Sequence, residues 1–395
     1  MAVMAGALIV ASCAGAPRKK EAPVFFPSSP EPPRVQYLTY FTGSKDIEEQ
    51  SGFDKFVVGE KRDLKVDKPY GVALFEGKLY VCDTNSGVVV FDLVKKSFDR
   101  LQGAVGPGAL QQPLNIAIES DGTKYVTDPV RGQVVVFDRK DVYLRAYGIT
   151  GAWRPVDAVP FEDRLYVADA ANGLVRVFDK ATGETLRTIG DKGEPEERLG
   201  RPTNLAFDAD GFLYVSDFGR FQVVKYDRDG HYRSTIGKLG DNLGHFARPK
   251  GIAFDRDGRL YAVDAAFNNV QVFNKDGRLL MFFGSAGEKP GDLLLPAKVT
   301  IDYDNLRFFE SYVAPGFQVH HLILVTAQFG PRRVNVFAAG QAKGMKYPTD
   351  AELLKEIDGL RKKELEKQKA AQPTEKPPDK TDKPDEPPPQ KPPGS

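Results

Sequence analysis

One stretch decides the fold: RPKGIAFDRDGRLYAVDAAFNNVQVFNKDGRLLMFFG, which runs from Arg248 to Gly284. It contains four short runs rich in apolar, aromatic and β-branched residues, the kinds that favour strands. Two of the gaps between these runs carry the turn signals Arg256-Asp257-Gly258 and Lys275-Asp276-Gly277. The stretch therefore predicts four short antiparallel strands joined by tight turns.

The same pattern recurs along the chain with a period of about 45 residues. A close copy runs from Arg201 to Gly237, and the others are looser. Each copy opens with a proline, and these are Pro69, Pro113, Pro155, Pro202, Pro249 and Pro296. A four-stranded unit repeated at this period is typical of a β-propeller, in which each blade buries its faces against its neighbours. We predict an all-β fold with six blades.

The sixth copy ends after its third strand, RVNVF, at Arg333–Phe337. The N-terminal segment VQYLTYFTG, from Val35 to Gly43, resembles the fourth strand of the fifth copy. Pairing of this segment into the last blade would close the ring and remove an exposed sheet edge. We therefore predict that the N-terminal strand completes blade six.

The segment GDNLGHFARPKGIAFDRDGRLYAVD, from Gly240 to Asp264, resembles the NHL repeat. The resemblance covers roughly residues 35–340 and is strongest in the fourth and fifth copies. It implies the propeller fold. It does not imply one function, because NHL propellers serve as protein-binding, RNA-binding and enzymatic modules.

The N-terminus, MAVMAGALIVASC, is an apolar run that ends at Cys13. Its last four residues resemble a bacterial lipobox, although no Lys or Arg precedes the run, and it is too short to span a bilayer as a helix. We expect residues 1–12 to be a lipoprotein signal peptide and Cys13 to be lipidated, with a chance cysteine in an apolar leader as the alternative. Ala14 in place of Asp favours the outer membrane of a bacterial envelope, and the membrane face stays open.

The other segments are distinguished by composition. We expect a tether at 13–34, the propeller at 35–340, a linker with a short helix at 341–371 and a disordered tail rich in Pro and Lys at 372–395. Thr349 and Glu352 have the spacing of a capping box at the start of that helix. In the tail nine of 24 residues are proline, which excludes a packed core.

Charge and cysteine content exclude several classes of partner. Lys and Arg total 55 and Asp and Glu total 54, so we expect no nucleic-acid partner. The only cysteine besides Cys13 is Cys82, so a lipidated Cys13 leaves it without an intrachain disulfide partner. No haem-attachment motif, phosphate loop or Ser/His/Asp arrangement is visible, and we expect no cofactor.

Function should lie where the copies differ. The first strand of a blade lies nearest the central channel, and its opening residues vary between copies. The channel-mouth candidates are Tyr70, Asn115, Asp157, Asn204, Lys250 and Lys298. Three oxygen-bearing side chains, those of Asn115, Asp157 and Asn204, come from consecutive blades. They are the candidates for a Ca²⁺ or Mg²⁺ site, or they line a hydrated channel. Sugar-lactonase propellers bind a metal in a broadly similar place.

We expect no metal, because three such oxygens are few for a hard cation. Zinc is disfavoured further, since the NHL-type amidating lyases use channel histidines and none of the six positions is His. In contrast, five copies end their second strand with an aspartate, which predicts a structural turn cap and not a catalytic group. These are Asp83, Asp128, Asp169, Asp217 and Asp264.

Blade six carries an aromatic insertion, IDYDNLRFFESYVAPGFQVHH. Phe308, Phe309, Tyr312 and Phe317 form a candidate partner surface, or the insertion covers the propeller's own side.

The sequence thus predicts a lipid-anchored envelope propeller that binds a protein or ligand or helps to assemble a complex, with an envelope protein as partner. The alternative is a metal-dependent hydrolase or lyase acting on a small substrate at the channel mouth. A structural spacer is the third class.

Overall fold

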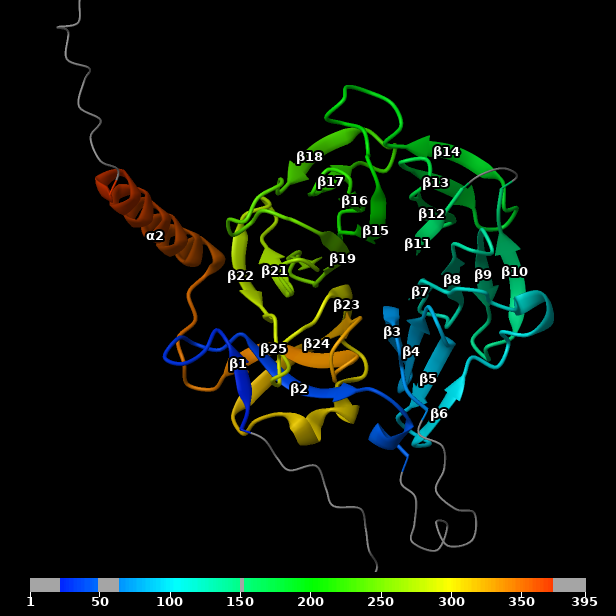
Figure 1. Cartoon of the computed structure of the whole chain (residues 1–395), viewed down its shortest axis with the longest axis horizontal. Helices are drawn as coiled ribbons and strands as arrows, with labels where there is room; N and C mark the ends of the chain where they lie inside the picture. Colours follow the sequence, from blue (N-terminus) through cyan, green and yellow to red (C-terminus); the bar gives the residue numbers. More distant parts are fainter. Residues whose placement is uncertain (1–21, 49–63, 150–152, 372–395) are drawn as a thin grey trace, which may run out of the picture. The chain divides into compact units, whose positions relative to one another are not determined.

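The computed structural model describes residues 22–48, 64–149 and 153–371. Six antiparallel sheets are arranged as blades around a ring, in chain order (Figure 1). Blades one to three consist of β3 (Pro69–Phe75), β4 (Lys78–Asp83), β5 (Gly87–Asp92), β6 (Ser97–Arg100), β7 (Asn115–Ile118), β8 (Lys124–Asp128), β9 (Gln133–Phe137), β10 (Tyr143–Tyr147), β11 (Pro155–Phe161), β12 (Arg164–Asp169), β13 (Leu174–Asp179) and β14 (Thr185–Ile189).

Blades four to six consist of β15 (Pro202–Phe207), β16 (Leu213–Asp217), β17 (Gln222–Tyr226), β18 (Tyr232–Ile236), β19 (Pro249–Phe254), β20 (Leu260–Asp264), β21 (Asn269–Phe273), β22 (Leu279–Phe283), β23 (Pro296–Asp302), β24 (Phe317–Ala327), β25 (Val334–Ala342), β2 (Val35–Phe41) and β1 (Val24–Phe26). Short 3-10 helices are η1 (Ser44–Asp46), η2 (Gly106–Gly108), η3 (Leu306–Phe308) and η4 (Glu310–Tyr312). The predicted six-bladed propeller is confirmed.

Blade five shows why the repeat folds this way. Gly258 adopts a φ of 78° in the turn between β19 and β20, a conformation that favours glycine. In the same turn Asp255 Oδ1 accepts the Arg259 N–H at 2.8 Å. All five residues of β21 are buried, because both faces of a blade pack against neighbouring blades. Local turn chemistry therefore defines the strands, and packing between blades buries them.

The ring is closed by β2, as the sequence predicts. This strand pairs antiparallel with β25, in a register that places Phe41 opposite Val334. The third strand of blade six is longer than expected and continues to Ala342. The N-terminal strand therefore supplies the fourth strand of the last blade.

The segment expected to be a tether contains a fifth strand of this blade. In β1, Val24 pairs with Tyr37, and the Phe26 ring lies 6.1 Å from that of Phe283. Phe25 packs 5.4 Å from Phe317. Because these half-buried apolar side chains pack against blades five and six, the propeller begins earlier than residue 35.

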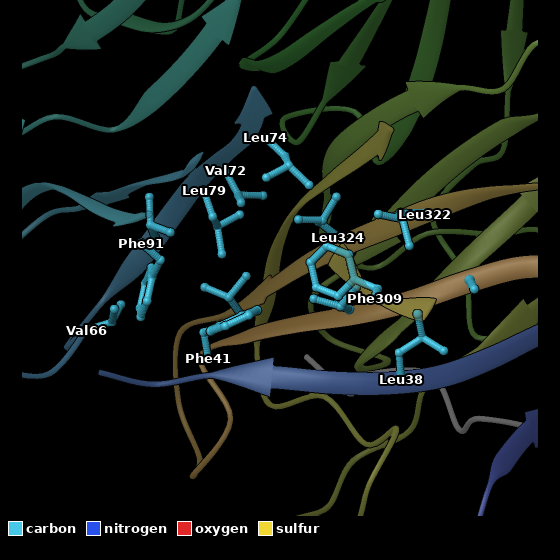
Figure 2. Close-up of a cluster of buried hydrophobic side chains, with 14 of the residues drawn as sticks. Leu38, Phe41, Val66, Val72, Leu74, Leu79, Phe91, Phe309, Leu322 and Leu324 are labelled. Atoms are coloured by element: carbon cyan, nitrogen blue, oxygen red, sulfur yellow. The ribbon is translucent and has the colours of Figure 1, made fainter. Parts of the chain in front are cut away.

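Figure 2 shows the apolar seam between blades six and one. Phe41 of β2 packs against Phe91 with 5.2 Å between ring centroids, and Leu79 and Leu324 are fully buried beside them. Burial of each such side chain contributes roughly 1.5–3 kcal/mol. The closing strand therefore belongs to a core cluster and does not only cover a sheet edge.

The segment from Pro348 onward is a separate unit, in which α2 spans Asp350–Ala371. Thr349 and Glu352 form the expected capping box: Thr349 N–H donates to Glu352 Oε2 at 2.8 Å, and Glu352 N–H donates to Thr349 Oγ1 at 3.3 Å. Among the described residues, no helix is both long and apolar enough to cross a membrane. The expected signal peptide, Cys13 and the tail at 372–395 lie outside the described residues.

Candidate channel-mouth site

The second residue after each repeat proline occupies an equivalent place on the six first strands. These residues are Gly71, Asn115, Asp157, Asn204, Gly251 and Lys298. The four with long side chains are buried, and Asp157 is only 1 % exposed. Sequence variation at this position therefore determines several of the groups that meet at the channel.

Asp157 and Lys298 meet across the ring. Lys298 Nζ of blade six lies 3.1 Å from Asp157 Oδ2 of blade three, and these blades are opposite each other in Figure 1. The same oxygen accepts the Leu205 N–H at 2.9 Å and Asn204 Nδ2 at 3.2 Å, while Oδ1 accepts the Ala158 N–H at 3.0 Å. The carboxylate is therefore paired with a cation and also accepts three N–H groups.

A second contact joins blades one and four, which are also opposite. Tyr70 donates its hydroxyl to Asn204 Oδ1 at 3.2 Å. Burial, and then the negative charge of Asp157, raise the pKa of Tyr70, so the phenol keeps its proton and acts as a donor. Tyr70, Asp157, Asn204 and Lys298 form what we call the cross-channel network.

Asn115 is not part of this network. Its Oδ1 accepts the adjacent Ile116 N–H at 3.3 Å, and its buried Nδ2 has no hydrogen-bond partner among the described residues. It lies against Gly71, where an added Cβ would come within 2.6 Å of the Asn115 Cα. Asp157 and Asn204 of the expected oxygen set therefore come together, and Asn115 faces blade one.

Lys250 lies beside the network without a carboxylate partner. Its Nζ donates to Gln328 Oε1 at 3.1 Å and lies 5.4 Å from the centre of the Tyr70 ring. Burial, with repulsion from Arg248 and Lys68, lowers the pKa of Lys250 to about 8. No ion pair to Lys250 occurs within the described ranges.

This arrangement leaves little room for a metal at Asp157. An ion there would have to displace the Lys298 ammonium and two N–H donors from Oδ2. The only grouping of three metal-ligand side chains found in the part of the chain that the structure describes is Asp227, Asp229 and His231. It lies in a surface turn, where Asp227 Oδ1 accepts the N–H groups of the other two.

The repeated aspartates are turn caps, as expected. Asp264 Oδ1 accepts the Ala266 and Phe267 N–H groups at 2.8 and 3.1 Å. Its Oδ2 accepts the Ala247 and Arg248 N–H groups at 2.7 and 3.0 Å. Each cap thus ties a hairpin to the segment that precedes the repeat proline.

The aromatic insertion packs largely on the propeller. Phe309 is 1 % exposed in the seam of Figure 2, Phe317 is 7 % exposed and Phe308 is half-buried. Only Tyr312 of the four candidate surface residues is exposed. Phe309 and Phe317 also line a cavity of about 400 Å³. Three of the four side chains therefore serve mainly the side of blade six, the second of the two expected roles.

Sequence reasoning missed three residues around Lys250. Gln328 follows β24, where the sixth copy departs from the repeat. Lys68 and Arg248 directly precede repeat prolines, and a signal for them was present, because this position is basic in four of the six copies.

The comparisons with known proteins agree with the fold. No protein-family model matches the chain. Human NHL repeat-containing protein 3 is 26 % identical over 186 residues, which is 40 % of this chain and 52 % of that protein. The chain is an NHL-type β-propeller. It spans about half the length of this curated relative.

Two solved structures resemble this NHL-type propeller in fold. An auxiliary nutrient binding protein from Bacteroides thetaiotaomicron has a TM-score of 0.54 and 14 % identity, over 78 % of this chain and 76 % of that one. A gluconolactonase from Xanthomonas campestris has a TM-score of 0.50 and 17 % identity, over 82 % of this chain and 99 % of that one. At these identities the likeness concerns the fold alone.

Proposed function

We propose that this propeller is a lipid-anchored binding module of the bacterial envelope, which holds a protein or ligand partner. The observation that carries the proposal is the pairing of Asp157 with Lys298. A metal-dependent hydrolase or lyase needs a carboxylate or imidazole that is free to bind the metal. At this mouth the carboxylate already accepts an ammonium and three N–H groups.

The neighbouring groups support the same conclusion. The raised pKa of Tyr70 keeps its hydroxyl protonated. Lys250 is the group near the network whose pKa is lowered toward neutrality, and its repulsive neighbours are two further cations. The Tyr70 hydroxyl is thus a hydrogen-bond donor and the three cations are positively charged at neutral pH, which suits the binding of an anion.

A metal titration tests the binding role against the enzymatic alternative. Calorimetry of the purified full chain with Ca²⁺, Mg²⁺ and Zn²⁺ should show no binding tighter than millimolar. Asp227→Ala provides a control for weak binding at the surface turn. Micromolar affinity that disappears in Asp157→Ala would reverse the proposal in favour of metal-dependent catalysis.

The anchor is tested separately. Cys13→Ala should abolish labelling by a fatty-acid analogue and move the protein to the soluble fraction or leave the precursor uncut. Cys82→Ala, which removes a buried thiol, is the matched control and should keep the label. Label that persists in Cys13→Ala would show that Cys13 is not the anchor.

A further inference from the structure

Basic side chains gather at the end of the channel where the first strands begin. The residue before the repeat proline is basic in blades one, three, four and five, and each of these side chains is exposed. They are Lys68, Arg154, Arg201 and Arg248. Pro69, Pro155, Pro202 and Pro249 each begin an innermost strand, so the residues before them lie at the end of the channel where Lys250 also lies.

Of these four cations, Lys68 and Arg248 repel the Lys250 ammonium and contribute to its lowered pKa. No ion pair joins Lys68, Arg248 or Lys250 to a carboxylate of the described residues. The acidic groups at this end include the buried turn caps and the exposed Asp67, whose Oδ2 accepts Asn85 Nδ2 at 2.6 Å. Asp264 and Asp83 each accept several backbone N–H groups, which hold the two carboxylates in place.

We propose that the channel mouth binds an oxyanion, a carboxylate or phosphate group, between Lys250, Lys68 and Arg248. This inference rests on the binding role proposed above and names the chemistry of the ligand. Gln328 Oε1 takes one of the three ammonium N–H bonds of Lys250 at 3.1 Å, which leaves two for the ligand. Lys68 and Arg248 supply charge from blades one and five.

The half-buried position of Lys250 is what makes the site selective for an anion. A partly desolvated ammonium gains more from a negative partner than an exposed one does, because the local dielectric is lower. The oxyanion can be a free small molecule or an acidic side chain of a partner polypeptide. Both sources offer the same group to the same three cations.

The pKa of Lys250 gives the site a recognisable pH dependence. A bound anion favours the charged ammonium, so binding above pH 8 must be accompanied by uptake of a proton. Affinity should therefore fall about tenfold for each pH unit above about 8, until the pKa of the complex is reached. The exposed arginines keep their charge in this range and add no such dependence.

The experiment titrates the full chain with citrate, with inorganic phosphate and with a glutamate-rich peptide, by calorimetry at pH 7 and pH 9.5. We expect binding of at least one probe at pH 7 and a loss of affinity on the order of tenfold or more at pH 9.5. Binding of citrate or phosphate indicates a free anion. Binding of the peptide alone indicates a polypeptide source. No binding of any probe overturns the proposal.

Two variants of Lys250 locate the site. Lys250→Met should lower affinity at pH 7 at least tenfold. Lys275→Met is the matched control, because Lys275 is exposed in the turn between β21 and β22 of the same blade, at the other end of the strands. Lys250→Arg should bind at pH 7 and lose the pH dependence, since its charge persists.

Equal affinity of Lys250→Met and Lys275→Met would show that the anion binds elsewhere. The metal titration separates this failure from failure of the binding role. A partner that is still bound by Lys250→Met would leave that role in place and refute the oxyanion site. Micromolar metal binding at Asp157 would overturn the role independently of these anion titrations.

Discussion

Two buried lysine–aspartate ion pairs have similar geometry but different roles in the propeller. Lys124 Nζ lies 2.9 Å from Asp141 Oδ1 and also donates to the carbonyl oxygens of Gly122 and Asp138. Lys298 Nζ lies 3.1 Å from Asp157 Oδ2 and has no other acceptor among the described residues. The first ammonium is saturated within blade two, whereas the second has N–H bonds left over in the channel.

The two pairs also differ in what they connect. Lys124 and Asp141 lie close together in the sequence, and Tyr80 of blade one donates its hydroxyl to the same carboxylate at 3.1 Å. That pair therefore fixes one seam between neighbouring blades. Asp157 and Lys298 belong to opposite blades, so their pairing spans the channel and neutralises a carboxylate at the mouth. The comparison shows that burial of an ion pair does not by itself reveal its role.

Removal of the saturated cation should have the largest effect. Lys124→Met leaves Asp141, which is 7 % exposed, with the Tyr80 hydroxyl and a distant Lys78 at 3.9 Å. We expect a loss of about 3–5 kcal/mol in the free energy of unfolding, because the buried carboxylate loses its close cation and keeps only the partly exposed Lys78. Denaturant unfolding measures it.

The control is Lys140→Met, which removes an exposed lysine from the turn next to Asp141. It should change the free energy of unfolding by less than about 0.5 kcal/mol. If the two variants unfolded alike, Lys124 would not fix the seam.

Removal of the cross-channel cation should cost less. In Lys298→Met, Asp157 keeps the N–H groups of Leu205, Asn204 and Ala158 as donors. We expect a loss of about 1–3 kcal/mol by the same measurement. A loss as large as that of Lys124→Met would mean that the pair across the channel is also a structural clamp.

A double substitution sharpens the distinction further. Lys298→Met combined with Asp157→Asn removes both charges, so no unpaired carboxylate remains. The free energy of unfolding of the double variant should lie within about 1 kcal/mol of the wild-type value and should be higher than that of Lys298→Met. The full double-mutant cycle gives the coupling energy, and a sum of independent single effects would contradict direct pairing.

The sequence predicted the parts of this molecule that depend on local signals. Repeat prolines and Asp-Gly turns mark the strands of each blade, and the apolar pattern of Val35–Phe41 matches the strand that blade six lacks. The three-residue strand β1 was missed because its pairing depends on β2 and carries no turn signal of its own. Variation between copies identified the residues at the channel mouth, but it did not identify the side chains that they contact.

The partners could not be found because they are set by the closed ring. Lys298 and Asp157 are joined only when blades three and six face each other. Asn115 was grouped with Asp157 and Asn204 because its position is equivalent, but the space left by Gly71 draws it toward blade one. The position of a residue in the repeat thus predicts where it lies in the blade, whereas the neighbouring side chains determine which contacts it makes.

The smallest change in the free energy of unfolding should come from substitution of Lys250, a third lysine, whose hydrogen-bond partner Gln328 is neutral. Its pKa of about 8 is below the usual 10.5, so the folded state holds the charged form at a cost. The contribution of this group to stability is complete above pH 10.5 and is lost as the pH falls through 8. Lys250→Gln should therefore be as stable as the wild type at pH 7, or more stable by up to about 1 kcal/mol. This difference should shrink as the pH rises from 8 to 10.

Denaturant unfolding of both proteins at pH 7, 8, 9 and 10 measures this difference in stability, with Lys275→Gln as the control that shows no trend. A Lys250→Gln variant that is clearly less stable at pH 7 would mean that the ammonium is already paired within the protein and is not available to a ligand.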